Sequence, residues 1–177
     1  MRVTEYERGR LDLAAYAARA QAGPCFICEL VAGRNPHPVV YRDDFAIAFL
    51  NRYPTLPGYV LVAPLEHKED VVTDLDEAAY LRLQSLIYRV GRAVSSVLPT
   101  ERLYVVSLGS KQGNTHVHWH VAPLPPGVPY EKQQFRALMH EENGYLVVPP
   151  EDAQHLAARI ASSLCEEAGR RQNDSAT

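Results

Sequence analysis

The sequence has no long apolar run and no large excess of charge of one sign, and each absence narrows what the protein can be. No stretch approaches the roughly 20 consecutive apolar residues that a membrane-spanning helix needs. The amino-terminal stretch, MRVTEYERGRLDLAAYAARAQAG, is charged throughout and lacks the apolar core of a secretory signal. The formal net charge is −3 in 177 residues, which argues against a protein that binds nucleic acid or a membrane over its whole surface. We therefore expect a cytoplasmic protein with no nucleic-acid partner and no membrane partner.

Cysteine is also scarce, since the chain has only 3. Two of them, Cys25 and Cys28, stand together in the sequence CFIC. In a reducing compartment such a pair is more typical of a metal site or a redox pair than of a structural disulfide. A redox pair is expected beside a thioredoxin-like βαβ pattern, and no such pattern follows here. The third cysteine, Cys165, is expected to pack alone in a helix.

The remaining pattern predicts one domain that mixes helices with antiparallel strands. A chain of this length buries a real core, and it contains neither an internal repeat nor a dividing linker. Helices are expected at 11–22, 74–98, 131–140 and from 150 onward, and strands at 39–51 (a hairpin), 59–64, 102–109, 115–124 and 145–148. Asp74 and Glu77 are spaced like a capping box at the start of the second helix. This order of elements favours an α+β fold over a parallel α/β sheet.

The most informative stretch is NTHVHWHVAPLP, in which three of the 7 histidines fall within five residues. Alternate residues of a β-strand share a face, so His116, His118 and His120 form one row while the apolar residues between them face the core. Three histidines in register are hard to obtain by chance on an exposed strand. A single catalytic zinc on all three is disfavoured, because the row spans about 13 Å of strand and Zn–N bonds are about 2.0–2.1 Å. The row is better explained by distinct roles, with a neutral imidazole as a nucleophile.

The sequence HVHWHVA resembles the histidine triad (HIT) signature, and FAIAFLNRYPTLPGYVLVAP is similar to the matching upstream region of the same superfamily. The likeness is greatest to its fragile-histidine-triad and dinucleoside polyphosphate hydrolase branch, and it covers roughly residues 25–125. It implies an α+β, HIT-like fold with an antiparallel sheet of about five strands and flanking helices. It also implies a homodimer that hydrolyses or transfers a nucleotide at the α-phosphate.

The resemblance implies roles for two of the histidines. His118 would attack the α-phosphorus and form a nucleotidyl-histidine that water hydrolyses, which suits an imidazole that is largely neutral near pH 7. His120 would donate to the substrate phosphate or to the leaving group; the alternative is that it is only a hydrogen-bonded neighbour. We expect a hydrolase that cleaves a dinucleoside polyphosphate or a nucleoside phosphoramidate, with an adenine nucleotide as substrate and a nucleoside monophosphate as product.

Two other functions stay open on the sequence. A nucleotidylyltransferase or phosphorylase would form the same intermediate and use phosphate or a metabolite in place of water. A zinc-stabilised nucleotide-binding module without turnover would need contacts to ribose and phosphate but no nucleophile. The intact His118 between two further histidines argues against that module.

A zinc site follows from the same resemblance. Some bacterial HIT proteins, and the related galactose-1-phosphate uridylyltransferases, bind zinc with two cysteines and two histidines, and the matching residues here are Cys25, Cys28, His67 and His116. Four protein ligands leave no open position, so the resemblance implies one structural zinc per chain that ties the N-terminal segment to the catalytic strand. The alternative is that His67 is a surface histidine and that the cysteines are small core residues.

The nucleotide contacts are expected around the same strand. The resemblance places a ribose contact at Asn51, for which turn chemistry before RYP is the alternative. The loop GSKQGNTH is shorter than in the family, so the expected phosphate contacts are substitutes: Gln112, Asn114 and Thr115, with added positive charge from Lys111. An apolar slot for the base is expected from Phe26, Phe45 and Leu50, each of which suits the core equally well.

The expected organisation has four parts. An N-terminal helical segment covers residues 1–24 and the HIT domain covers 25–125. A C-terminal extension at 126–168 packs on the same domain, and residues 169–177 form a disordered tail. Within the extension, Gln133 and Gln134 close over the pocket or belong to a plain surface loop.

Overall fold

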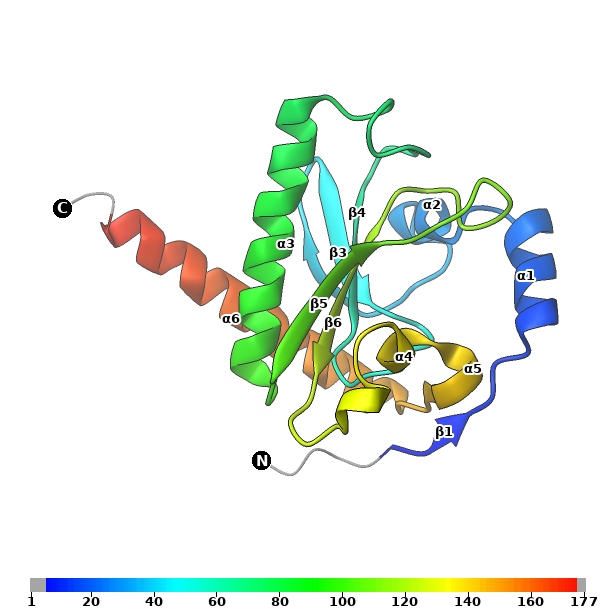
Figure 1. Cartoon of the computed structure of the whole chain (residues 1–177). Coiled ribbons are helices and arrows are strands. Elements are labelled where there is room, and N and C mark those ends of the chain that lie inside the picture. The colour runs from blue at the N-terminus through cyan, green and yellow to red at the C-terminus, as the bar shows by residue number, and fades with distance from the viewer. Residues whose placement is uncertain (1–5, 175–177) are drawn as a thin grey trace.

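The structure is a computed structural model that describes residues 6–174 (Figure 1). Its helices are α1 (Leu13–Ala22), α2 (Phe26–Val31), α3 (Glu77–Val97), α4 (Phe135–Leu138), α5 (His140–Asn143) and α6 (Pro150–Asp174), with a 3-10 turn, η1, at Tyr130–Lys132. Its strands are β1 (Arg8–Gly9), β2 (Val39–Arg42), β3 (Ala46–Leu50), β4 (Val60–Pro64), β5 (Arg102–Ser107), β6 (Trp119–Leu124) and β7 (Tyr145–Leu146). Within residues 6–174, every helix falls short of the length or the apolar character that crossing a bilayer requires.

Five of the strands form one antiparallel sheet in the order β2-β3-β4-β6-β5. The expected hairpin is β2–β3, and Asp43 holds its turn because Oδ1 accepts from the N–H groups of Phe45 and Ala46 at 2.9 and 2.7 Å. Strand β6 lies between β4 and β5, so His120 is flanked by a paired strand on each side. The sheet and its flanking helices confirm the predicted α+β fold with an antiparallel sheet of five strands.

Both faces of the sheet are covered, and the alternation along each strand assigns its side chains to one face or the other. Ala48 and Val62 belong to the core that α3 and α6 complete, whereas Ile47 and Phe49 pack with Ile27 of α2 on the opposite face. Figure 1 shows α3 and α6 together on one side and α2 on the other. The three apolar residues of the histidine stretch belong to the α3 side: Val117, Trp119 and Val121. The histidines between them therefore face the side of α2.

The start of α3 differs from the sequence prediction. The N-cap is Asp76, whose side chain accepts from the N–H of Ala79, and it is not Asp74. Asp74 instead accepts from the N–H groups of Glu69 and Asp70, which stabilises the preceding loop. The predicted capping box of Asp74 with Glu77 was wrong, because two aspartates precede this helix and spacing alone does not select between them.

The histidine strand is shorter than expected. Strand β6 begins only at Trp119, and residues 115–118 approach it outside the ladder of strand hydrogen bonds. In this approach the N–H of Val117 donates to the carbonyl of Lys68 at 2.6 Å. Val117 and Trp119 nevertheless both enter the core, so the alternation continues across the break and the histidines keep a common side.

The two ends of the chain differ further. The helix expected at 131–140 is divided into η1, α4 and α5, since Gln134 has a φ of 59° and ends any continuous helix there. Strand β1 pairs with β7, so the N-terminal segment contains a strand as well as a helix. Helix α6 supplies Ala157, Ile160 and Leu164 to the core and continues to Asp174, where a disordered tail was expected from 169. Residues 175–177 of that predicted tail lie outside the described residues.

Candidate active site and metal centre

A cavity of about 1070 Å³ opens on the α2 side of the sheet. Its walls come from α1, from α2, from the end of β3 and from the loop at 108–115, and both His118 and His120 line it. Four apolar side chains line part of it: Phe26, Leu30, Phe49 and Leu61. A concave apolar space with a few polar groups is the usual form of a small-molecule site.

The tautomer of His118 follows from one contact. Nδ1 lies 2.7 Å from the backbone carbonyl oxygen of His116, which can only accept, so Nδ1 carries the hydrogen and Nε2 holds a lone pair. The ring is 5% exposed, and this loss of solvent lowers the pKa of His118 below its usual value. His118 is therefore a neutral imidazole at pH 7, with the bare nitrogen that a nucleophile needs.

His120 lies beside His118, with the ring centroids 4.8 Å apart. Its hydrogen is on the opposite ring nitrogen to that of His118, for the following reason. Its Nδ1 lies 3.0 Å from the hydroxyl of Tyr59. Burial raises the pKa of Tyr59 well above its usual value, so the phenol keeps its proton, and we assign it as the donor to Nδ1. Nε2 of His120 then carries the hydrogen, and this buried atom has no hydrogen-bond partner among the described residues. Desolvation lowers the pKa of His120 to about 3, so this ring is neutral too.

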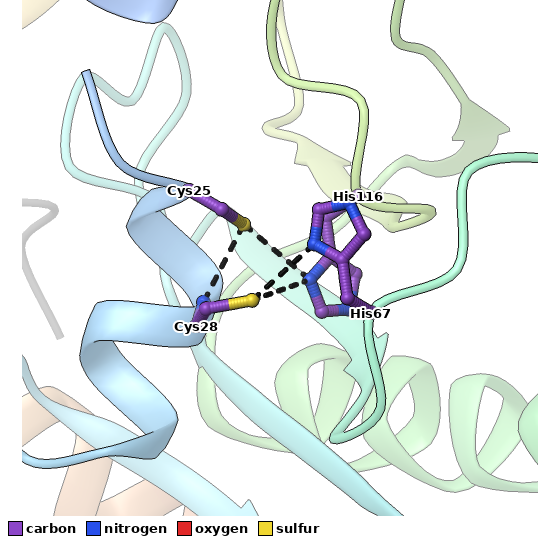
Figure 2. A group of neighbouring side chains, drawn as sticks. All are labelled: Cys25, Cys28, His67 and His116. Carbon is purple, nitrogen blue, oxygen red and sulfur yellow. Dashed lines mark hydrogen bonds between the residues drawn. The ribbon is translucent and has the colours of Figure 1, made fainter.

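Next to this pair, four side chains converge on one point: Cys25, Cys28, His67 and His116 (Figure 2). Sγ of Cys25 lies 3.5 Å from Nδ1 of His116. Sγ of Cys28 lies 3.3 Å from Nδ1 of His67 and 3.6 Å from Nδ1 of His116. All four donor atoms are within 4.8 Å of one another. A tetrahedral zinc with bonds of about 2.0–2.3 Å separates its donors by roughly 3.3–3.8 Å, so the donor set and its spacing fit this ion.

The outer nitrogens of both imidazoles are already engaged, which directs the inner nitrogens to the cluster. Nε2 of His116 lies 3.0 Å from the carbonyl oxygen of Pro64, and Nε2 of His67 lies 3.2 Å from the carboxylate of Glu69. Both partners accept, so each Nδ1 presents a lone pair. Desolvation lowers the pKa of His116 to about 4, which keeps this ring neutral.

The thiol of Cys28 differs from the imidazoles in its state at neutral pH, because it keeps a proton that a metal would have to displace. Desolvation, reinforced by the neighbouring Cys25, raises the pKa of the Cys28 thiol to about 11. Since a metal binds the thiolate, a cation at this point would displace the proton that the Cys28 thiol keeps at neutral pH.

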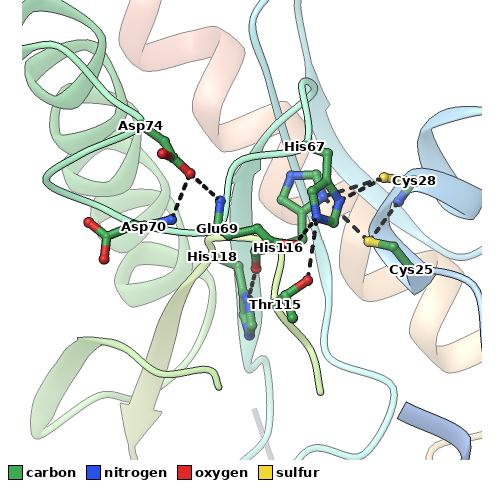
Figure 3. Close-up of polar contacts among 9 residues, drawn as sticks. All are labelled: Cys25, Cys28, His67, Glu69, Asp70, Asp74, Thr115, His116 and His118. Atoms are coloured by element: carbon green, nitrogen blue, oxygen red, sulfur yellow. Dashed lines mark hydrogen bonds and ion pairs between the residues drawn. The ribbon is translucent and has the colours of Figure 1, made fainter. Parts of the chain in front are cut away.

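The four-residue cluster and His118 share one segment of backbone (Figure 3). The imidazole of His116 enters the cluster, while its carbonyl accepts from Nδ1 of His118. Thr115 is tied to the same place, since its Oγ1 lies 3.3 Å from Nε2 of His67. A metal at this point would fix His116 and, with it, the acceptor that sets the tautomer of His118. The four side chains would fill every position of a tetrahedral ion, so a metal here would be structural.

The four residues predicted to contact the nucleotide all line the cavity: Asn51, Gln112, Asn114 and Thr115. Lys111 lines it as well. Asn51 also has the role in the turn before RYP that was the alternative to a ribose contact, because its Oδ1 accepts from the N–H of Tyr53 at 2.9 Å. An amide oxygen has two lone pairs, so this bond does not exhaust its capacity.

Of the three residues predicted to line an apolar slot, Phe26 does so, and its ring lies edge-on to that of His118 with centroids 6.1 Å apart. Phe45 packs on the α3 side with the guanidinium of Arg82 over its ring at 4.5 Å. Leu50 is in the core of that same side. For Phe45 and Leu50 the structure therefore selects core packing, which was the stated alternative to the slot. The sequence did not settle Leu50 because it does not say which face of β3 meets α2.

Gln133 and Gln134 are absent from the cavity wall. Gln133 donates through Nε2 to the carbonyl of Val128 at 2.9 Å, and the N–H of Gln134 donates to the hydroxyl of Tyr104 at 2.8 Å. Both glutamines therefore belong to a surface loop, which was one of the two readings of this segment.

Sequence reasoning missed Tyr59 and two residues of the cavity wall, Tyr16 of α1 and His140 of α5. Tyr59 could have been found from the sequence, because its polar hydroxyl stands directly before the apolar strand β4. Tyr16 enters through a tertiary contact, since Nδ2 of Asn114 donates to its hydroxyl at 2.8 Å. His140 is positioned by the carbonyl of Tyr53, 2.8 Å from its Nε2. Nothing in the local sequence points to either of these two.

With this geometry established, the chain can be compared with known proteins. The adenosine 5′-monophosphoramidase hnt1 of Schizosaccharomyces pombe is 26% identical over 130 residues, which cover 66% of this chain and 94% of that protein. Among solved structures, a hypothetical histidine triad nucleotide-binding protein from Sulfolobus tokodaii superposes with a TM-score of 0.66 at 23% identity, covering 80% of this chain and 93% of that one. A Zn-bound histidine triad family protein from Mycobacterium smegmatis gives a TM-score of 0.62 at 23% identity, covering 86% and 97%. These likenesses to solved structures concern the fold.

The family itself is identified by a separate match. The model of the HIT domain matches residues 32–126, which is more than half of the chain and includes all three clustered histidines. The resemblance read from the sequence is thereby confirmed: this chain belongs to the HIT domain family.

Proposed function

We propose that the protein is a HIT-type nucleotidyl hydrolase that cleaves at the α-phosphate of a dinucleoside polyphosphate or a nucleoside phosphoramidate and releases a nucleoside monophosphate. One observation carries the proposal: the bare Nε2 of His118 and the hydrogen-bearing Nε2 of His120 stand side by side in one cavity. The first suits a nucleophile and the second suits a hydrogen-bond donor to developing negative charge. A site that only binds nucleotides requires neither arrangement.

In the proposed reaction, Nε2 of His118 attacks the α-phosphorus, and the bond to the leaving group breaks with its electron pair going to the leaving group. A leaving nitrogen takes a proton from water, whereas a leaving phosphate departs as an anion. The N–H of His120 donates to the leaving atom or to a phosphate oxygen, where negative charge develops. The carbonyl of His116, which accepts from Nδ1 of His118, stabilises the positive charge that the ring carries once phosphorus is attached.

In the second step, water attacks the nucleotidyl-histidine, the phosphorus–nitrogen bond breaks, and the nucleoside monophosphate leaves with one proton released to solvent. The imidazole of His118 is thereby restored to its starting tautomer, with Nδ1 still bound to the carbonyl of His116. The burial of His118 keeps the free ring neutral. A neutral ring is required for the attack in the first step, and it is restored by the second step.

The rest of the cavity suits a nucleotide. Its apolar side chains are proposed to hold the base, Asn51 the ribose, and Gln112, Asn114 and Thr115 the phosphates. The similarity to an adenosine 5′-monophosphoramidase supports an adenine nucleotide, and the sequence resemblance to the fragile-histidine-triad branch supports the wider choice of dinucleoside polyphosphates.

One structural zinc per chain belongs to the same proposal. It is supported by the donor distances at Cys25, Cys28, His67 and His116 and by the likeness to a Zn-bound histidine triad protein. When bound, the ion would supply a rigid anchor for His116 and no catalytic chemistry. The proposal also includes the homodimer that the family resemblance implies, and a cytoplasmic location in which both thiols stay reduced and able to bind metal.

The test compares the wild type with His118→Ala, using adenosine phosphoramidate and diadenosine polyphosphates as substrates. We expect the wild type to release AMP and to show a transient adenylylated mass after quenching without acid, and His118→Ala to do neither. His155→Ala removes an exposed histidine of α6 and serves as the matched control with normal turnover. Retained turnover in His118→Ala would remove this residue as the nucleophile.

A further inference from the structure

Helix α1 lies outside the residues that match the HIT domain, yet it forms a wall of the cavity. None of its residues is buried in the core. It is held instead by the loop before the histidines, where Asn114 donates to the hydroxyl of Tyr16 at 2.8 Å. The same loop approaches closely at Gly113, since a Cβ there would lie 3.2 Å from the Cβ of Ala20. Figure 1 shows α1 beside α2, apart from the sheet. The site therefore extends beyond the matched domain.

The cavity is larger than most small-molecule sites. Its volume of about 1070 Å³ lies just above the roughly 300–1,000 Å³ typical of such sites. His118, His120 and the apolar side chains occupy the part in which the attacked nucleotide is proposed to bind. The part that α1 and Tyr53 line is left for whatever is joined to that nucleotide beyond the α-phosphorus.

Aromatic rings line this second part. Tyr16 and Tyr53 both face the cavity, with ring centroids 5.9 Å apart at an interplanar angle of 89°. Tyr145, which does not line this cavity, contacts the ring of Tyr53 edge-on, with ring centroids 5.2 Å apart at an interplanar angle of 82°. Rings held in this way offer a rigid surface on which a planar group such as a nucleobase can stack.

Positive charge gathers in the same cavity. Its charged lining residues are Arg19, Arg52, Lys111 and Glu69, three cations against one carboxylate in a chain whose net charge is −3. Arg52 and Glu69 are each bonded to a neighbouring side chain, and Lys111 also interacts with Asp70. Arg19, in the last turn of α1, is the cation that this helix contributes. Such a local excess attracts an anionic ligand.

We propose that α1, through Tyr16 and Arg19, forms a leaving-group subsite for an anionic group that carries a flat ring, as the phosphates and base of a second nucleotide do. The inference rests on the proposed function, because it assigns the part of the substrate that lies beyond the attacked phosphorus. An ammonia leaving group would use neither the ring nor the charge. The subsite therefore favours a substrate with a second nucleotide over a phosphoramidate.

Equilibrium binding tests the subsite without turnover. In a His118→Ala background, calorimetry measures the Kd of AMP, ATP and diadenosine tetraphosphate, before and after Tyr16→Ala or Arg19→Ala is added. We expect diadenosine tetraphosphate to bind at least about tenfold tighter than AMP, which corresponds to one aromatic contact with a base. Tyr16→Ala should weaken diadenosine tetraphosphate about tenfold more than Tyr16→Phe does, because both variants lose the hydroxyl bonded to Asn114 and only Tyr16→Ala loses the ring. ATP should bind equally to these two variants. Arg19→Ala should weaken ATP and diadenosine tetraphosphate together and leave AMP unchanged.

Two variants serve as references. Tyr16→Phe keeps the ring and loses only the hydroxyl that accepts from Asn114. Arg10→Ala removes an exposed arginine that does not line the cavity, and it should bind all three ligands as the parent does. Equal weakening of AMP and diadenosine tetraphosphate in Tyr16→Ala would overturn the subsite, because α1 would then only support the fold. Equal affinity of the parent for these two ligands would overturn it as well. A wild type that keeps the expected binding pattern but forms no adenylylated mass would support the subsite and contradict the hydrolase.

Discussion

Tyr59→Phe is the substitution that examines the histidine pair most directly. It removes one hydroxyl, which lies 3.0 Å from Nδ1 of His120, and it keeps the ring that packs in the core on the α2 side. Without this donor, the hydrogen of His120 is no longer held on Nε2 by a hydrogen bond at Nδ1. The buried Nδ1 also loses its partner. Tyr59 touches no part of the substrate in this scheme. It is a positioning residue that acts through His120.

The expected size of the effect follows from this contact. A buried acceptor that loses its hydrogen bond costs about 1–3 kcal/mol. If about 1–2 kcal/mol of that appears in the transition state, the rate falls about 5- to 30-fold, since each 1.36 kcal/mol is tenfold. The loss should fall on kcat and leave KM nearly unchanged, because the donor at Nε2 matters most when negative charge develops.

The assay uses two aryl esters of AMP that differ in the leaving group. A phenyl ester leaves poorly and needs stabilisation of the charge on its oxygen, whereas a 4-nitrophenyl ester leaves well without it. The wild type and Tyr59→Phe are compared by kcat and KM on both esters, with the Kd of AMP as a check on binding. We expect Tyr59→Phe to slow the phenyl ester by the full factor and the nitrophenyl ester by much less.

The matched control is Tyr104→Phe, which removes a hydroxyl from β5 outside the cavity and should change neither ester. An equal slowing of both esters by Tyr59→Phe would refute donation from His120 to the leaving atom, and it would assign that donor to a phosphate oxygen instead. A weakened Kd for AMP with unchanged kcat would refute it too, and would assign Tyr59 to the shape of the pocket.

The remaining predictions concern the metal, the ribose and pH. Cys25→Ser should lower both zinc content and the thermal midpoint by several degrees, at about 2–4 °C per kcal/mol for a chain of this size; an unchanged midpoint, with the exposed Cys165→Ser as control, would contradict the structural zinc. Asn51→Ala should raise KM severalfold more for ribonucleotides than for 2′-deoxyribonucleotides, and equal effects would assign Asn51 to its turn alone. Desolvation lowers the pKa of His118 below the usual 6.5, so the neutral nucleophile is lost only as pH falls through that lower value. The acid limb of kcat/KM should therefore lie below pH 6.5, and a limb at or above it would show that His118 is not desolvated in solution.

The sequence by itself determined the central part of the sheet and the side to which its histidines turn. Alternation with a period of two is a local property of an extended backbone, so the apolar residues between the histidines reached the core even where the ladder stops at Trp119. The convergence of Cys25, Cys28, His67 and His116 was also predicted, through the family resemblance. Spacing along the chain would not have selected His67, which lies 39 residues from Cys28.

Only the tertiary structure decided which groups surround those histidines. Whether Phe49 or Leu50 faces the cavity depends on which side of β3 carries α2, and that is settled by packing of the whole core. The hydroxyl that faces His120 comes from Tyr59, 61 residues away in the chain, and Tyr16 is 98 residues from the asparagine that holds it. A sequence pattern records what each side chain can donate or accept, but the choice of partner depends on distances that exist only after the chain has folded.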